Sequence, residues 1–269
     1  MTKTPRQTQP FRWGAIAASV TLAATPALSS QITPQVTLAT PNLWLIQDQG
    51  GEAGEAGITD NASTDAAYLA ELAIIEGHML AARDLYARGK TAEAVELSIH
   101  PQQEGTLDAL RAEIAAHKAP DPADAITAFT AAMSAGSDQA NVDAALAAVS
   151  QVFSADAAVE ADEVRARFDA VTLLVKAAAG EYAASIENGA VADPMGWHEA
   201  LAFVAIARRD LTDLTAAPMS AKAAPKALEA LAEADTVFGD PMAADLLAGD
   251  PQILLGIAAR VELIASSVR

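Results

Sequence analysis

The stretch TDAAYLAELAIIEGHMLAARDLYARGKTAEAVELSIHP, residues 64–101, indicates the fold class of the whole chain. Its apolar side chains recur every three or four residues, the spacing that places them on one face of a helix. They are Tyr68, Leu72, Ile75, Met79, Ala82 and Tyr86. Gly89 follows where a helix end favours a left-handed residue, Thr91 is suited to cap a second helix, and His100-Pro101 predicts the end of that helix. The stretch therefore predicts a helical hairpin.

The dipeptide Asp-Pro occurs four times downstream, each time ahead of an alanine-rich or leucine-rich stretch. The four copies are Asp121-Pro122, Asp193-Pro194, Asp240-Pro241 and Asp250-Pro251. An Asp carboxylate can accept the first backbone N–H groups of a helix, and Pro in the first turn gives up only a donor that has no partner there. We therefore expect four helix starts at these positions.

Helical spacing continues through residues 142–153, 164–182 and 254–268. No stretch after residue 62 alternates with period two over a convincing length, and β-branched residues are few relative to alanine. The fold class expected is all-α, a bundle of about eight or nine antiparallel helices. Its alanine-rich faces should let helix axes approach closely.

The first residues read as an export leader. Lys3, Arg6 and Arg12 are the only charges ahead of an apolar run over residues 13–28, and small residues follow. The run is short for a permanent membrane span. We expect a signal peptide over residues 1–29, cleavage near Ser30 and a periplasmic mature protein.

Residues 30–62 are rich in glycine, proline and polar residues and predict a flexible linker, interrupted by an apolar island at residues 43–46. The helical body should then span residues 63–269, as one bundle or as two sub-bundles dividing near residue 136.

The chain is strongly acidic, with 17 Lys and Arg against 35 Asp and Glu and a net charge of −18. Removing the three basic residues of the leader leaves 14 basic residues and a net charge of −21. Such a charge argues against nucleic acid and against adsorption to an anionic membrane. We expect a protein partner or a small ligand in the envelope, and no stable membrane insertion after cleavage of the leader.

The chain has no cysteine, which rules out a disulfide, a thiolate metal site, a thiol nucleophile and a c-type haem attachment site. It also lacks the Gly-x-Ser-x-Gly, phosphate-loop and His-Glu-x-x-His patterns. We therefore expect a protein that is not an enzyme and has no resident cofactor, apart from the metal considered next.

The histidines carry the remaining chemistry. His78 lies beside the apolar stripe of the first helix, two residues after Glu76, and His100 could return towards that helix if the hairpin folds back, with Glu104 nearby. Imidazole and carboxylate together suit zinc, iron or copper. The alternative for His78 is a buried histidine that is satisfied by a hydrogen bond.

His198 adds a further candidate ligand, next to Trp197 and Glu199, although a packed helix start explains it equally well. The predicted metal set is thus His78, His100, Glu76, Glu104 and His198. His117, at the end of a helix, is better explained by the helix dipole.

Two resemblances extend this interpretation. LYARGKTAEAV, residues 85–95, resembles the turn of a tetratricopeptide-type hairpin, but no 34-residue recurrence follows. EYAASIENGAV (residues 181–191) and WHEALAF (residues 197–203), with Glu76-Gly77-His78 and His100-Pro101, resemble exported all-helical periplasmic domains of the kind associated with bacterial iron permeases. That resemblance implies an all-helical fold and an accessory or metal-handling role.

Two hypotheses of function follow. In the first, the chain is a soluble, non-enzymatic helical module in the periplasm that binds a partner or ligand. In the alternative, it handles a metal ion, iron or copper, or haem, through its His and Glu cluster.

Overall fold

The computed structural model describes residues 55, 57–103, 106–158 and 163–268, all within one compact unit, Leu45–Arg269. The expected signal peptide, the apolar island and most of the expected linker lie outside the described residues. Glu55 and residues 57–62, the described part of that linker, form turns ahead of the first helix.

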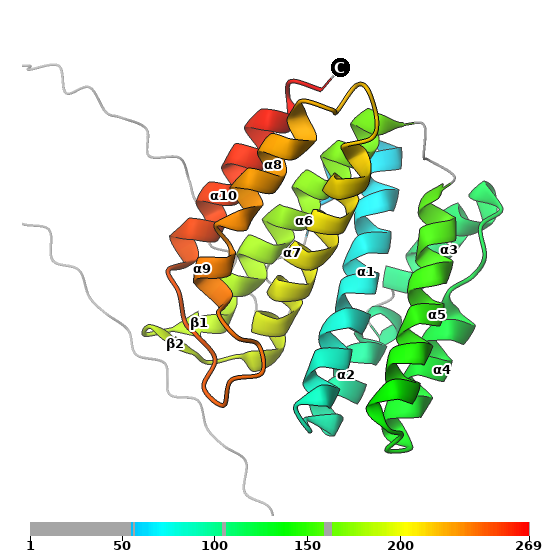
Figure 1. Ribbon diagram of the computed structural model, residues 1–269. Helices are drawn as coiled ribbons and strands as arrows, with labels where there is room; N and C mark the ends of the chain where they lie inside the picture. The colour runs from blue at the N-terminus through cyan, green and yellow to red at the C-terminus, as the bar shows by residue number, and fades with distance from the viewer. Residues whose placement is uncertain (1–54, 56, 104–105, 159–162, 269) are drawn as a thin grey trace, which may run out of the picture. The chain divides into compact units, whose positions relative to one another are not determined.

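The described residues fold into nine helices of ten residues or more, one single-turn helix and a short hairpin (Figure 1). In chain order these are α1 (Thr64–Ala87), α2 (Thr91–Gln103), α3 (Thr106–His117), α4 (Ala123–Ser134), α5 (Gln139–Ala157), α6 (Val164–Ser185), β1 (Ile186–Glu187), β2 (Ala190–Val191), α7 (Pro194–Leu214), α8 (Ala223–Ala232), α9 (Asp235–Phe238) and α10 (Pro251–Ala265). The prediction of an all-α bundle is confirmed. No described helix is both long and apolar enough to cross a membrane.

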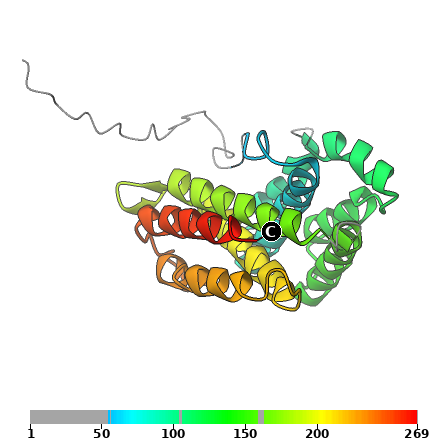
Figure 2. The ribbon, with the colours of Figure 1, turned by 90° about the horizontal axis from the view of Figure 1, so that it is seen from above.

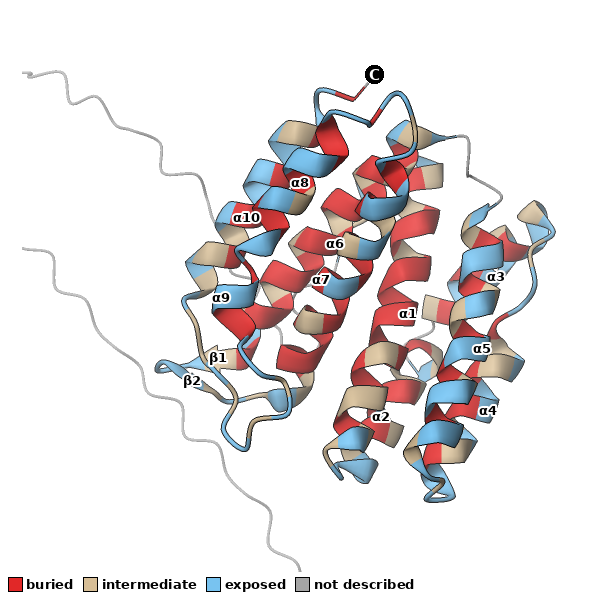
Figure 3. Cartoon of the chain, viewed as in Figure 1, coloured by how far each residue is buried: buried red, intermediate tan, exposed pale blue. Residues whose placement is uncertain are grey.

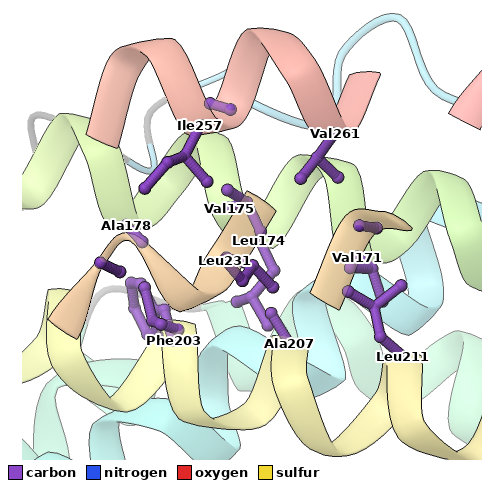
Figure 4. Packing of buried hydrophobic residues seen from close by; sticks show 14 of the residues in the cluster. Val171, Leu174, Val175, Ala178, Phe203, Ala207, Leu211, Leu231, Ile257 and Val261 are labelled. Carbon is purple, nitrogen blue, oxygen red and sulfur yellow. The ribbon is translucent and has the colours of Figure 1, made fainter. Parts of the chain in front are cut away.

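Four of the helices close a ring. α6 packs on α7, α7 on α8, α8 on α10, and α10 again on α6, an arrangement that is visible when the bundle is seen from above (Figure 2). Branched and aromatic side chains fill the space between them, together with alanines (Figure 4). The labelled core includes Val171, Val175, Ala207, Leu211, Leu231, Ile257 and Val261.

α1 joins this ring to the other helices. It packs on α6 and α7 on one side and on α2, α3 and α5 on the other, so it is buried along most of its length (Figure 3). The predicted stripe is buried from Tyr68 to Ala82, but Ala73 and Ile74 belong to the ring's core on a second face. A helix that is buried on several faces is apolar nearly all round.

Three of the four Asp-Pro pairs begin helices as predicted. In each of them the Asp carboxylate accepts a hydrogen bond of 2.9 Å from the backbone N–H of the residue two positions later in the chain. These are Asp121, Asp193 and Asp250. The prediction for Asp240-Pro241 is wrong, because only turns follow it. Side chains that are distant in sequence donate hydrogen bonds to the carbonyls of this segment: Arg88 to Pro241 and Ala243, Trp197 to Leu247, and Tyr182 to Gly249. Backbone groups satisfied in this way have no need of a helix.

One smaller prediction is also wrong. Pro101 does not end α2, which continues to Gln103 with Pro101 buried inside it. Proline has no backbone N–H, so one carbonyl of the preceding turn lacks its helical hydrogen bond. This costs little near the end of a helix, where several carbonyls have no such bond in any case.

The hairpin of β1 and β2 turns at Asn188-Gly189. Both residues have positive φ, as a tight two-residue turn prefers.

The contact between α1 and α7 depends on the absence of a side chain at Gly77. A Cβ atom built there would lie 2.3 Å from Cδ1 of Phe203, whose side chain is fully buried. Gly256, in the middle of α10, has nothing within 4 Å of the same position. Alanine substitutions at these two glycines therefore distinguish the effect of packing on stability from the effect of helix propensity.

We expect Gly77→Ala to lower the free energy of unfolding by about 1–3 kcal/mol, because the methyl group overpacks the contact with Phe203. Gly256→Ala should instead raise it by roughly 0.5–1 kcal/mol, because alanine is the better helix former. Urea denaturation of both variants checks this. Equal or greater stability of Gly77→Ala relative to Gly256→Ala would contradict the packing argument.

Asp156, near the end of α5, is fully buried, and neither of its carboxylate oxygens has a hydrogen-bond partner among the described residues. Burial, with a smaller contribution from the charge of Asp121, raises its pKa to about 6. In an unfolded chain the pKa is about 3.9. Folding therefore favours the protonated form, and this stabilisation is present below about pH 4 and is lost as the pH rises to about 6.

Asp156→Asn should accordingly stabilise the protein at pH 7.5, by an amount on the order of 1 kcal/mol after allowance for solvent screening. The difference from wild type should shrink towards zero at pH 4, where the native carboxyl is already neutral. Thermal melts at both pH values measure this, with Asp124→Asn, at an exposed position, as a control. A difference for Asp156→Asn that does not change with pH would refute the assignment.

Candidate metal centre

Three helices bring two imidazoles and one carboxylate together. His78 of α1, His100 of α2 and Glu199 of α7 each offer one ligand atom, and these atoms lie within 4.8 Å of one another. His78 and Glu199 are buried, and His100 is half-buried. The cluster thus lies inside the protein, where the N-terminal helices meet the four-helix ring.

The hairpin of α1 and α2 sets the level of the two histidines. Gly89, at φ +77°, reverses the chain between the helices. His78 lies nine residues before the end of α1, and His100 lies nine residues after the start of α2. At 1.5 Å per residue both are about 14 Å from the turn. The predicted return of His100 is therefore found, and it reaches the level of His78.

Three consecutive residues of α1 contact α7. The carboxylate of Glu76 receives two hydrogen bonds from Arg209, at 2.6 and 2.8 Å, and Gly77 abuts Phe203. His78 then lies 3.4 Å from Glu199, measured from Nε2 to Oε1. Residues of increasing number on α1 contact residues of decreasing number on α7, so the two helices are antiparallel. This register positions Glu199 against His78.

The imidazole of His78 is oriented by its own helix. Its Nδ1 lies 2.9 Å from the backbone carbonyl of Ile74, and because a carbonyl can only accept, Nδ1 carries the hydrogen. In the neutral ring, Nε2 then presents its lone pair to the cluster. The ring of Phe203 packs against it edge-on, with 5.8 Å between the centroids. A histidine held by a second hydrogen bond in this way is the usual arrangement of a metal ligand.

The separation of His78 and Glu199 also suits an ion. Metal–ligand bonds of about 2.0–2.2 Å place the ligand atoms of a tetrahedral site about 3.3–3.6 Å apart. The 3.4 Å between His78 and Glu199 lies in this range. Glu55, in the turns ahead of α1, has its Oε1 at 3.5 Å from the same nitrogen.

The structure does not bring all of the predicted ligands together. Glu76 lies two residues from His78, on a different face of α1, and its carboxylate is bound by Arg209. Glu104 lies outside the described residues. Of the five predicted ligands, His78 and His100 are the two that the described structure places in the cluster.

His198 is adjacent to Glu199 but belongs to a different face of α7. Its ring packs edge-on to Trp197, with centroids 5.0 Å apart, and is fully buried. Burial, and then the positive charge of Arg88, lowers its pKa to about 4. It is therefore a neutral core histidine at physiological pH.

Sequence reasoning missed Glu199 as a candidate ligand. Glu199 and Phe203 are four residues apart and so share one face of α7. The available signal was that Glu199 lies on the same face of α7 as Phe203. It can be used only when the contact between Phe203 and Gly77 is already known.

The comparison with known families can now be set against this geometry. Residues 156–262 match the model of the iron permease-associated 4-helix bundle domain. The matched segment includes α6, α7 and α8 and most of α10, the helices that close the ring, and it confirms the resemblance to helical domains of iron permeases. Glu199 lies inside this segment, and His78 and His100 lie outside it. No curated protein and no solved structure matches the chain.

Proposed function

We propose that this chain is a helical accessory module of an iron-permease system and that it binds iron(II) at His78, His100 and Glu199. The observation that carries the proposal is the convergence of these three side chains from three different helices, with ligand atoms within 4.8 Å. The family match of residues 156–262 supports iron as the relevant metal.

The donor set fits this ion chemically. Two imidazoles and one carboxylate with open coordination positions are the set preferred by non-haem iron(II). Zinc and copper bind the same donors, so selectivity among them depends on geometry and on supply. We infer that the site holds its ion for delivery and does not use it for a reaction.

The N-terminal sequence supports the role of a module outside the cytoplasm. The basic and then apolar character of residues 1–29 is typical of a cleaved leader. The envelope partner that we propose is the permease itself. The net charge of −18 would favour the approach of cations to the protein.

A haem group fits the cluster less well than an ion does. A cavity of about 280 Å³ lies beside Glu76, Phe153 and Arg209, and a groove of about 950 Å³ lies beside Arg88 and Leu247. Neither is lined by His78, His100 or Glu199. We therefore propose an ion, which needs no space beyond its ligands.

Anaerobic titration of the untagged exported protein with iron(II) tests the proposal. Wild type should bind one equivalent, and a His78→Ala, His100→Ala double variant or Glu199→Gln should lose that equivalent. His117→Ala is the matched control, because this histidine stacks on Tyr68 and should not affect binding. At a free-iron concentration 100 times the dissociation constant, wild type should also gain about 2.7 kcal/mol of stability.

The proposal is wrong if the double variant, folded according to its circular dichroism and melting curve, binds iron(II) as wild type does. It is also wrong if wild type binds no more tightly than the double variant. Parallel titrations with zinc and copper(II) establish which ion the site prefers.

A further inference from the structure

We propose that the groove beside Arg88 and Leu247 binds an extended peptide segment of a partner protein. The segment pairs through its backbone with the edge of β2 and places a carboxylate against Arg88. This inference goes beyond the proposed function, because none of the three residues of the metal centre lines the groove.

Three parts of the chain that are distant in sequence form the groove. They are the turn between α1 and α2, the segment from the β-hairpin to the start of α7, and the loop between α9 and α10. In Figure 1 the hairpin and that loop lie at the same end of the bundle. The volume of about 950 Å³ is at the upper end of the range for ligand sites. The apolar lining includes Leu85, Met195 and Leu246, and Leu247, which is 47% exposed.

The edge of β2 faces this groove. Gly189, Ala190 and Val191 line it one after another, whereas neither residue of β1 does. Successive side chains of a strand point to opposite faces of the sheet. A run of consecutive lining residues on one strand alone therefore means that the groove meets the hairpin along the edge of β2.

The hydrogen-bond pattern of the hairpin leaves Val191 able to pair on that edge. Ala192 N–H donates to the carbonyl of Ser185 at 2.9 Å. Hydrogen-bonded and non-bonded pairs alternate along an antiparallel ladder, so the neighbouring pair of Ile186 and Val191 is non-bonded. The N–H and C=O of Val191 therefore point away from β1, and no backbone hydrogen bond among the described residues takes up either group. An extended peptide adds to a strand edge of this kind.

Arg88 provides the second point of recognition. Its Nη1 donates to the carbonyls of Pro241 and Ala243, at 2.5 and 2.8 Å, so its charge is met there by neutral groups. No described residue accepts a hydrogen bond from its Nε or Nη2. These two nitrogens form the side of a guanidinium that binds a carboxylate through two parallel hydrogen bonds.

The acidic residues that line the groove do not pair with Arg88 in the described structure. Glu93 lies 3.5 Å from Lys90, and Asp193 accepts the N–H of Met195 at the start of α7. Asp245 is exposed. The charge of Arg88 is therefore complementary to an added carboxylate.

The two points of recognition together define the occupant. A strand edge selects a main chain in the extended conformation, and the guanidinium selects a carboxylate, which an Asp or Glu side chain or a C-terminus can supply. A small carboxylic acid would use Arg88 but would leave the edge of β2 unpaired. We therefore infer a peptide segment with apolar side chains beside its carboxylate.

Selection from a library of short random peptides with free C-termini, displayed against the full-length untagged chain, tests the proposal. The strongest binder is then synthesised, and its affinity is measured by calorimetry. Arg88→Gln should weaken binding by at least about tenfold, because hydrogen bonds to a charged group are lost. Lys226→Gln is the matched control and should not weaken it, because Lys226 is exposed on α8 and does not line the groove.

Two altered peptides identify the source of the carboxylate. In one the C-terminus is amidated, and in the other each Asp or Glu is replaced by its amide. One of them should bind wild type at least about tenfold more weakly than the parent peptide does, and should lose little further affinity for Arg88→Gln. If wild type binds both as tightly as the parent, the proposal is wrong.

Hydrogen exchange of the Val191 amide, followed by NMR, is an independent readout that needs no change in the protein. The peptide should slow this exchange in wild type. It should do the same in the His78→Ala, His100→Ala double variant, so the result does not depend on whether the metal centre binds iron. The proposal is overturned if the peptide leaves exchange at Val191 unchanged, or if the selection enriches no peptide for wild type over Arg88→Gln.

Discussion

The close approach of α1 and α7 is the contact on which the rest of this structure depends. At Glu76-Gly77-His78 a charged pair, a bare backbone and an imidazole meet α7 in successive positions. The missing side chain of Gly77 admits the ring of Phe203, and that ring in turn packs against His78. Helix packing and the candidate centre therefore rest on the same few atoms.

This contact also joins two parts of the chain, the segment that matches the family model and the helices that precede it. Most of the four-helix ring lies within the region that matches the iron permease-associated domain, whereas α1 to α4 precede it. The candidate centre takes Glu199 from one side of this boundary and His78 and His100 from the other. In the proposed site, the helices before the matched domain therefore supply both imidazoles.

Much of the fold could be predicted because its causes are local. Apolar spacing along residues 64–101 and the carboxylates of Asp121, Asp193 and Asp250 act within a few residues of where they stand. Asp240-Pro241 has the same local chemistry, yet helix formation fails there because Arg88, Trp197 and Tyr182 bond the carbonyls that follow. Those partners are distant in sequence, so no local pattern reveals them.

The candidate site was predictable only in part for the same reason. His78 and His100 share a hairpin, so counting residues from the turn brings them together. The third ligand depends on the register between α1 and α7, which Gly77 and Phe203 fix through their contact. The sequence pointed to His198 as the candidate ligand, whereas that register places its neighbour Glu199 in the cluster.

Anomalous diffraction from crystals grown with iron(II), collected at the iron edge, tests the central claim most directly. The account predicts one strong peak enclosed by His78, His100 and Glu199, at about 2.0–2.2 Å from their ligand atoms. Ordered iron found only at surface carboxylates, with none between these three side chains, would contradict it.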